Sequence, residues 1–298
     1  MPQFNLYQEE LPPSPLQFTW QEFKLNHIAV IGFYCLIFFV VLAVLGPLLA
    51  PFDPLQQQTD SLLIPPSWDA SGGIVHLFGT DGLGRDILSR VIYGCQMTFG
   101  ISILLVLLAL LIGVTLGAVA GMNRGFRSSF VNHLLDSLMA IPTLLIAIVI
   151  IAILGTGLVN SMWAITLALI PKFIHQTRDF VRNEVRKEYV MAAKLDGASK
   201  RQMFFNSILP NMGEMLVVQG TLALSIAILD ISALGFLNLG AQAPTPELGA
   251  MLSEGIDVAY LAPWNIALPG AAIFLMIVSI NLVGDGLRSA LRNRLLHS

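Results

Sequence analysis

The sequence predicts an all-α integral membrane protein with six transmembrane helices and with both termini in the cytoplasm. The first observation is composition: 55% of the 298 residues are hydrophobic and only 12% are charged, whereas about 25% of the residues of a soluble domain are charged. A chain so poor in charge cannot cover its surface with solvated groups, so lipid must surround much of it. The second observation is that lysine and arginine are concentrated in alternate connecting segments.

Six apolar segments are long enough to cross a bilayer, which takes about 20 residues of helix. They are residues 28–50, 97–121, 134–154, 158–175, 214–236 and 267–287. The first segment ends at Ala50, and the proline that follows disfavours cleavage by a signal peptidase. We therefore expect the first segment to be a retained anchor and not a signal peptide.

Positive charge orients these spans. If the N-terminus is cytoplasmic, fourteen of the sixteen lysine and arginine residues fall in cytoplasmic segments, and only Arg85 and Arg90 are external. The opposite orientation would contradict the tendency of cytoplasmic loops to carry the excess of positive charge. The expected organisation is a cytoplasmic or interfacial segment 1–27, an anchor 28–50, an external segment 51–96, a core 97–287 with five spans, and a cytoplasmic tail 288–298.

The external segment ends in "FGTDGLGRDILSRVIYG", which we expect to form an amphipathic helix, since Ile87, Leu88 and Val91 recur on one helical face. Asp86 and Arg90 are four residues apart and are expected to pair along that helix. The glycines of this stretch lack the lysine of a phosphate-binding loop, so no nucleotide site is expected there.

Two features within the spans are candidates for a role in a pathway through the membrane. Gly113, Gly117 and Gly121 repeat every fourth residue, so they share one helix face and either line the pathway or serve ordinary helix packing. Asp230 is an ionisable residue inside the fifth span, where it either acts as a pathway or gate carboxylate or is satisfied by neighbouring backbone and hydroxyl groups. Pro142 is expected to kink the third span.

Residues 176–212 are a long polar insert between the fourth and fifth spans. The pair Asp196–Gly197 predicts the end of one helix, because glycine readily adopts the left-handed conformation found there. Ser199, with Gln202 three residues later, predicts the start of a second helix through a capping box, and Pro210 is expected to end it. The insert is therefore expected to be a helical hairpin, either a docking element for another protein or a solvated connection.

Other chemical classes find little support in the sequence. The net charge of -3 offers no basic patch for nucleic acid, and Cys35 and Cys95 form no metal-binding or disulfide pattern. A secondary transporter is expected to show inverted repeats and several buried charges, and a membrane enzyme a paired nucleophile and base; neither pattern is visible. No metal or cofactor is expected in this chain, which is not expected to be an enzyme. Because the chain lacks a phosphate-binding loop for ATP, the energy for any transport must come from a partner protein.

The insert resembles a known signature. "EYVMAAKLDGASKRQMFFNSILP" is similar to the coupling segment of bacterial binding-protein-dependent ABC transporter permeases, in which this segment enters a groove of a separate ATPase subunit. The resemblance implies the type I ABC importer permease fold and an ATP site that belongs to the partner ATPases. The residues that it assigns to ATPase coupling are Glu188, Ala192, Ala193, Asp196, Gly197, Ala198 and Ser199.

Further stretches resemble the dipeptide, oligopeptide and nickel branch of this family, second-subunit type. The external motif of that branch matches Gly79, Thr80, Asp81, Gly84, Arg85, Asp86 and Arg90. "LLIPPSW" and "ILDISALGFLNLGAQ" resemble the Sap transport systems, which are linked to antimicrobial peptides. Gln96 and Leu248 depart from the branch pattern and leave the transported substrate open.

The resemblance implies a permease in the bacterial inner membrane that moves peptides, including antimicrobial peptides. The alternative is the same fold moving a small cation such as a polyamine, with export as a second possible direction. The implied partners are a second homologous permease subunit as a heterodimer, two ABC ATPase subunits, a periplasmic solute-binding protein and membrane lipid. No nucleic acid is implied.

Overall fold

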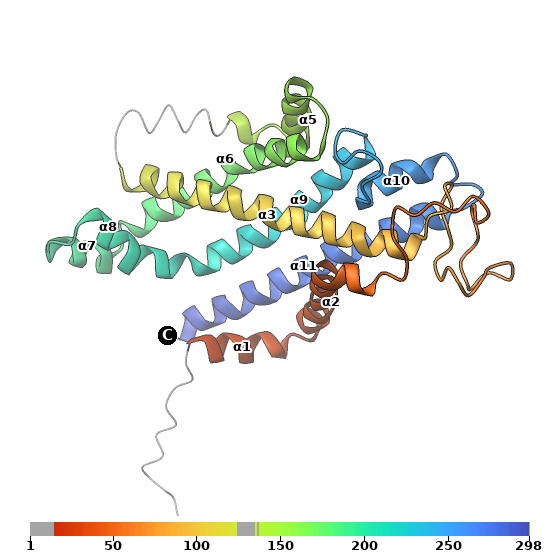
Figure 1. Cartoon of the computed structure of the whole chain (residues 1–298). Coiled ribbons are helices and arrows are strands. Elements are labelled where there is room, and N and C mark those ends of the chain that lie inside the picture. Colours follow the sequence, from red (N-terminus) through yellow and green to blue (C-terminus); the bar gives the residue numbers. More distant parts are fainter. Residues whose placement is uncertain (1–14, 124–134, 136, 298) are drawn as a thin grey trace, which may run out of the picture.

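The computed structural model describes residues 15–123, 135 and 137–297. The regular elements of this part of the chain are helices, residues 50–86 form a long segment of turns and irregular structure, and one isolated bridge joins Thr80 and Asp86 (Figure 1). The elements are α1 (Pro15–Leu25), α2 (His27–Leu49), α3 (Ile87–Met122), α5 (Thr143–Leu154), α6 (Leu158–Glu184), α7 (Glu188–Leu195), α8 (Lys200–Met203), the π-turn η1 (Phe204–Ile208), the 3-10 turn η2 (Leu209–Met212), α9 (Gly213–Phe236), α10 (Leu248–Ile256) and α11 (Trp264–His297).

Five helical stretches within the described residues are long and apolar enough to cross a membrane. They are His27–Leu49, Ile87–Met122, Leu158–Glu184, Lys200–Phe236 and Trp264–Asn293. The remaining predicted span, 134–154, begins outside the described residues, and its described helix α5 has only 12 residues. The kink expected at Pro142 is a break in the helix, because a turn and a bend at positions 140 and 141 precede α5. Six spans therefore remain a prediction.

Helices α3 and α6 are longer than the predicted spans. The amphipathic external helix and the second span form one continuous helix, α3, and α6 continues to Glu184 within the polar insert. The expectation that Pro210 ends a helix is wrong, because the helical stretch passes through it into α9. Pro210 lies in the first positions of η2, directly after the π-turn, where a missing backbone N–H donor costs little.

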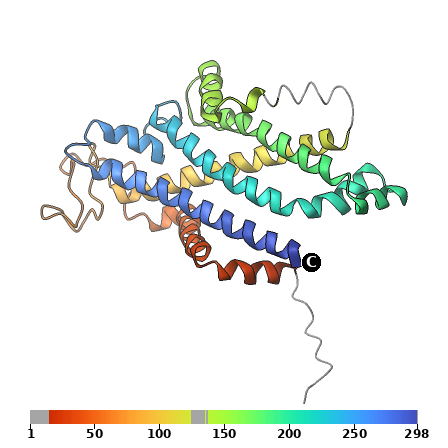
Figure 2. The same ribbon diagram turned by 180° about the vertical axis from the view of Figure 1, so that it is seen from behind.

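The glycine repeat on α3 allows close packing against α6. A Cβ atom at Gly113 would lie 2.3 Å from the Cβ of Phe173, and one at Gly117 would lie 2.7 Å from the Cβ of Thr177. Contact at these distances is impossible for larger residues, so the two helices can approach this closely only through glycine. In Figures 1 and 2, α3 and α6 accordingly run side by side.

Helix α9 is central in the bundle and packs against α3, α6, α10 and α11. One apolar core joins Leu105 of α3, Ile151 of α5, Leu169 of α6 and Ile231 of α9. The first described helix, α1, lies along the last turns of the final helix, α11 (Figure 2). The fold thus places the two ends of the described chain beside each other.

Candidate functional sites

The helical hairpin predicted within 176–212 is present. Helix α7 ends at Leu195 with Asp196 as its C-cap, and Gly197 has a φ of 86°, in the left-handed region that favours glycine. Ser199 caps α8: its backbone N–H donates to Oε1 of Gln202 at 2.9 Å, and its hydroxyl accepts from the backbone N–H of Gln202 at 3.3 Å. The stop at Gly197 and the capping box at Ser199 are both confirmed.

The tip of this hairpin presents small and apolar groups to the outside. Glu188, Ala192, Asp196, Gly197 and Ser199 are exposed, whereas Ala193 and Ala198 are half-buried. Beside them, 87% of the surface of Leu195 is exposed. A Cβ atom placed on Gly197 would meet nothing within 4 Å. The seven residues assigned to coupling therefore lie on α7 and in the turn that leads to α8, and five of them are exposed.

A polar cluster that the sequence did not reveal holds the hairpin to the bundle. The carboxylate of Glu184, the last residue of α6, is 4% exposed and accepts from Nζ of Lys187 and from the hydroxyl of Tyr189. The amide of Asn211 in η2 donates to the same hydroxyl at 3.0 Å. Burial and the neighbouring carboxylate of Glu184 raise the pKa of Tyr189 to about 12.

Asp230 lies in the C-terminal half of α9 and is 6% exposed. The hydroxyl of Thr143, at the start of α5, is a hydrogen-bond partner of its carboxylate. Within the described residues, Oδ2 of Asp230 has no hydrogen-bond partner. The other two pathway candidates, Gly113 and Gly117, lie against side-chain and backbone atoms of α6 instead.

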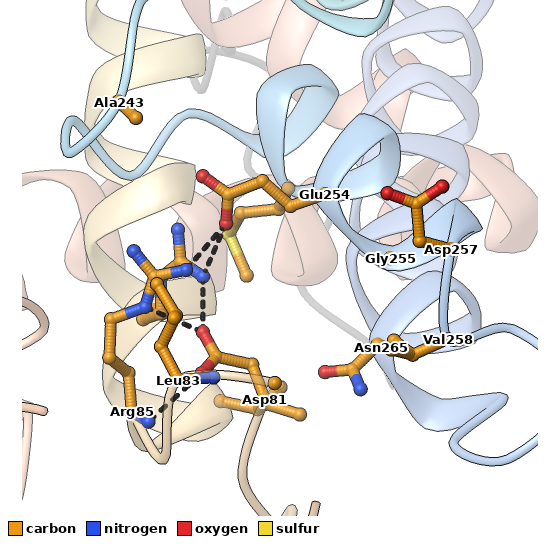
Figure 3. Close-up of a pocket in the computed structure, with 13 residues that line it drawn as sticks. Asp81, Leu83, Arg85, Ala243, Glu254, Gly255, Asp257, Val258 and Asn265 are labelled. Carbon is orange, nitrogen blue, oxygen red and sulfur yellow. Dashed lines mark hydrogen bonds and ion pairs between the residues drawn. The ribbon is translucent and has the colours of Figure 1, made fainter. Parts of the chain in front are cut away.

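The external motif forms a cluster of four charged side chains (Figure 3). Nε of Arg85 lies 2.7 Å from Oδ2 of Asp81, and Nη1 of Arg90 lies 2.6 Å from the same oxygen. Glu254 of α10 completes the cluster, with its Oε2 atom 2.7 Å from Nη2 of Arg85 and 2.8 Å from Nη1 of Arg90. The two arginines assigned to the external side are therefore buried and neutralised by two carboxylates.

Sequence analysis missed Glu254, since it lies more than 160 residues from the arginines. One signal could have suggested it: the segment 237–266 contains acidic residues but no lysine or arginine, so its carboxylates must find cations elsewhere. The predicted pair between Asp86 and Arg90 is wrong. Asp86 is instead the N-cap of α3, because its carboxylate accepts from the backbone N–H of Ser89. Its Oδ1 atom also lies 2.9 Å from Nδ1 of His76.

The backbone of the external motif needs glycine at two points. Gly79 and Gly84 have φ values of 79° and 73°. A Cβ atom at Gly84 would lie 2.0 Å from the carbonyl oxygen of Gln58. Thr80 ties the same loop to the preceding segment, because its hydroxyl accepts from the backbone N–H of Ile64 at 2.8 Å and donates to the carbonyl of Ser61.

Two external carboxyl groups have opposite pKa shifts. Burial raises the pKa of Asp81, but the backbone N–H of Arg85 and the charges of Arg90 and Arg85 outweigh it, so the net pKa is lowered. Burial raises the pKa of Glu247, despite hydrogen bonds from the backbone N–H groups of Gly249 and Ala250. Relative to a free side chain, the fold thus shifts the equilibrium of Asp81 toward its charged form and that of Glu247 toward its neutral form. Among the described residues, no group of His, Cys, Asp and Glu is arranged to hold a metal ion.

Two known protein families match parts of this chain. Residues 113–297 match the family described as "Binding-protein-dependent transport system inner membrane component". Residues 14–66 match the "N-terminal TM domain of oligopeptide transport permease C". The first match begins inside α3, at Gly113, and covers the helical hairpin and the spans that follow α3. The second covers α1, α2 and the start of the segment that follows α2.

Individual proteins resemble the chain over nearly its whole length. The peptide transport system permease protein SapC of Escherichia coli is 44% identical over 98% of both chains. The di/tripeptide transport system permease protein DppC of Pseudomonas aeruginosa is 44% identical over 95% of this chain and 93% of its own. A chain of the inward-facing MetNI methionine ABC transporter has a TM-score of 0.55 at 16% identity, covering 69% of this chain and 97% of that one. That structure shares the fold.

Proposed function

The chain belongs to the family of binding-protein-dependent inner membrane transport components, and from this premise we propose that it is the second permease subunit of an ABC importer for peptides. The relatives named SapC and DppC, which are peptide, di/tripeptide and dipeptide permeases, support peptides as the substrate class. The similarity to SapC supports antimicrobial peptides among those substrates.

One observation carries the proposed energy coupling: the open tip of the α7–α8 hairpin. A hairpin that only connected two spans would gain nothing from exposing Leu195 beside small residues. An ATPase subunit that covered this tip would bury apolar surface and approach the backbone at Gly197, where no side chain obstructs it. ATP would be bound by two such partner subunits, so this chain needs no cofactor of its own.

The proposed membrane topology has six spans and cytoplasmic termini. The packing of α1 beside the end of α11 supports placing both termini on the same side of the membrane. The distribution of lysine and arginine supports the cytoplasm as that side. The burial of Arg85 and Arg90 by acidic partners supports it as well, because neutralised arginines place little net charge on the external surface.

A second, homologous permease subunit would complete the pathway. The exposed apolar residues Leu145, Val149 and Ile153 on α5 would face that subunit or lipid. Asp230 is proposed as a pathway or gate carboxylate, with its unpartnered oxygen as the supporting observation. Gly113 and Gly117 would contribute to the pathway by holding α3 against α6. A periplasmic solute-binding protein would deliver the substrate from outside.

Co-expression with the neighbouring transport genes tests this proposal. The complex is purified through this chain, reconstituted in lipid nanodiscs, and assayed for ATP hydrolysis with the solute-binding protein and either peptides or polyamines. We expect two ATPase subunits to co-purify and peptides to stimulate hydrolysis. Stimulation by polyamines alone would overturn the substrate class. Recovery of the intact chain without any ATPase subunit would overturn the function itself.

A further inference from the structure

A cavity of about 420 Å³ opens beside the external charge cluster, between the external motif, α10 and the start of α11. Cavities that hold ligands measure roughly 300 to 1,000 Å³. Leu83, Met251 and Val258 line its apolar wall. Figure 3 shows Asp257 and Asn265 on the side of the cavity opposite Asp81. The cavity is therefore large enough for a protein loop and offers it both apolar and polar contacts.

Three buried hydrogen-bond donors among the described residues that line this cavity lack an acceptor: Nε and Nη2 of Arg90, and Nδ2 of Asn265. Asn265 is 5% exposed, and its Nδ2 atom makes no hydrogen bond to any described residue. The side chain is directed from α11 toward the Asp81 side of the cavity (Figure 3). A buried amide donor without an acceptor is unfavourable, so this position calls for a carbonyl or similar oxygen from an occupant.

The rim of the cavity is acidic. Both arginines use Oε2 of Glu254, so its Oε1 atom accepts from no described residue. The carboxylate of Asp257 is exposed and likewise has no partner within the described residues. The lining carries three carboxylates against two guanidinium groups, and the segment 237–266 adds no lysine or arginine. The opening therefore attracts a cation.

We propose that this cavity receives a basic loop of the solute-binding protein. The lysine or arginine of that loop lies between Glu254 and Asp257, its aliphatic stem contacts Val258, and a backbone carbonyl accepts from Nδ2 of Asn265. This occupant satisfies the acidic rim, the apolar wall and the unpartnered amide together. The inference rests on the proposed function, which places the cavity on the external side of an importer.

Affinity measurements test the charge requirement. The solute-binding protein is titrated against the complete complex in nanodiscs carrying Asp257→Asn or Asp257→Lys. We expect Asp257→Asn to weaken binding by about tenfold and to flatten its salt dependence, and Asp257→Lys to weaken it further. The matched control is Asp69→Asn, which removes an exposed external carboxylate outside the cavity. Unchanged affinity in both Asp257 variants, or an equal loss in the control, would overturn the proposal.

Cross-linking identifies the occupant. A photo-reactive amino acid at position 258 is irradiated in the complex in the presence of the solute-binding protein. A cross-link to a lysine- or arginine-containing loop of that protein supports the proposal, and reversing that cation to glutamate should rescue Asp257→Lys. A cross-link to the second permease, or to neither protein, overturns it. Co-purification of the ATPase subunits in every variant would show that such a failure concerns this cavity and not the proposed function.

Discussion

The hydroxyl of Tyr189, in the first turn of α7, donates a hydrogen bond to the buried carboxylate of Glu184 at the end of α6. This contact connects the exposed hairpin to a helix that crosses the membrane. Asn211 extends it to η2 and hence to the start of α9. A displacement of the hairpin would therefore be passed to the spans through this hydrogen bond as well as through the apolar cluster of Val181, Val190 and Met212.

Replacing Tyr189 by phenylalanine tests this connection. A hydrogen bond to a buried charged group contributes about 1.5 to 3 kcal/mol, and because Tyr189 is 41% exposed we take the lower limit. A loss of about 1.5 kcal/mol corresponds to about a tenfold change in the equilibrium between a hairpin held against α6 and a hairpin released from it. We expect normal co-purification of the ATPase but less peptide transported per ATP hydrolysed. The control is Tyr260→Phe, at a tyrosine that is 98% exposed. Equal coupling ratios in the two variants would contradict the prediction.

Two substitutions at Gly197 separate backbone strain from obstruction of the docking surface. The positive φ of 86° makes any L-residue unfavourable there by roughly 1 to 2 kcal/mol, although a Cβ atom would meet no neighbour. We expect Gly197→Ala to retain the ATPase and Gly197→Trp to lose most of it, while both remain inserted in the membrane. Pull-down of the ATPase from solubilised membranes measures the difference. Full recovery with tryptophan would exclude this surface as the docking site.

Bulk at Gly113 should force α3 and α6 apart. The nearest atom to an added Cβ is the Cβ of Phe173, which cannot move independently of its backbone. Overpacking typically costs about 1 to 3 kcal/mol, so Gly113→Leu should lower the thermal midpoint of the detergent-solubilised protein. Gly100→Leu, on the same helix but with open space around its Cβ, is the matched control. Similar midpoints for the two variants would show that this packing is not required.

The lowered pKa of Asp81 predicts a pH-dependent stability of the external cluster. Its folded pKa lies below the ordinary value of 3.8, so ionised Asp81 stabilises the fold above that value and loses its effect as the pH falls through the folded pKa. The difference in thermal midpoint between the wild type and Asp81→Asn should therefore be large at pH 7 and shrink below about pH 4. A difference that is constant between pH 7 and pH 3 would contradict this assignment.

The features of the fold and the site that could be predicted are those set by residues close together in the sequence. Five of the six apolar segments overlap spanning helices, because hydropathy is a property of a continuous stretch. The bend of the hairpin was predicted correctly, since Gly197 and Ser199 act on backbone groups within a few residues of themselves, but the end predicted at Pro210 was not. The partners of Glu184 were not predicted, because no local pattern indicates that the carboxylate at the end of α6 is buried.

The sequence by itself determined which segments are apolar, how basic charge is distributed between them and where the hairpin bends. Only the tertiary structure decided that Glu254 joins Asp81 and the two arginines, that Asp86 pairs with His76 rather than Arg90, and that the helix continues through Pro210. For the charge cluster the physical reason is distance along the chain: a charge pairs with the partner that the fold brings within hydrogen-bonding reach, and Arg85 and Glu254 are 169 residues apart. His76 is only ten residues from Asp86, and there the irregular loop between them decides which side chains meet.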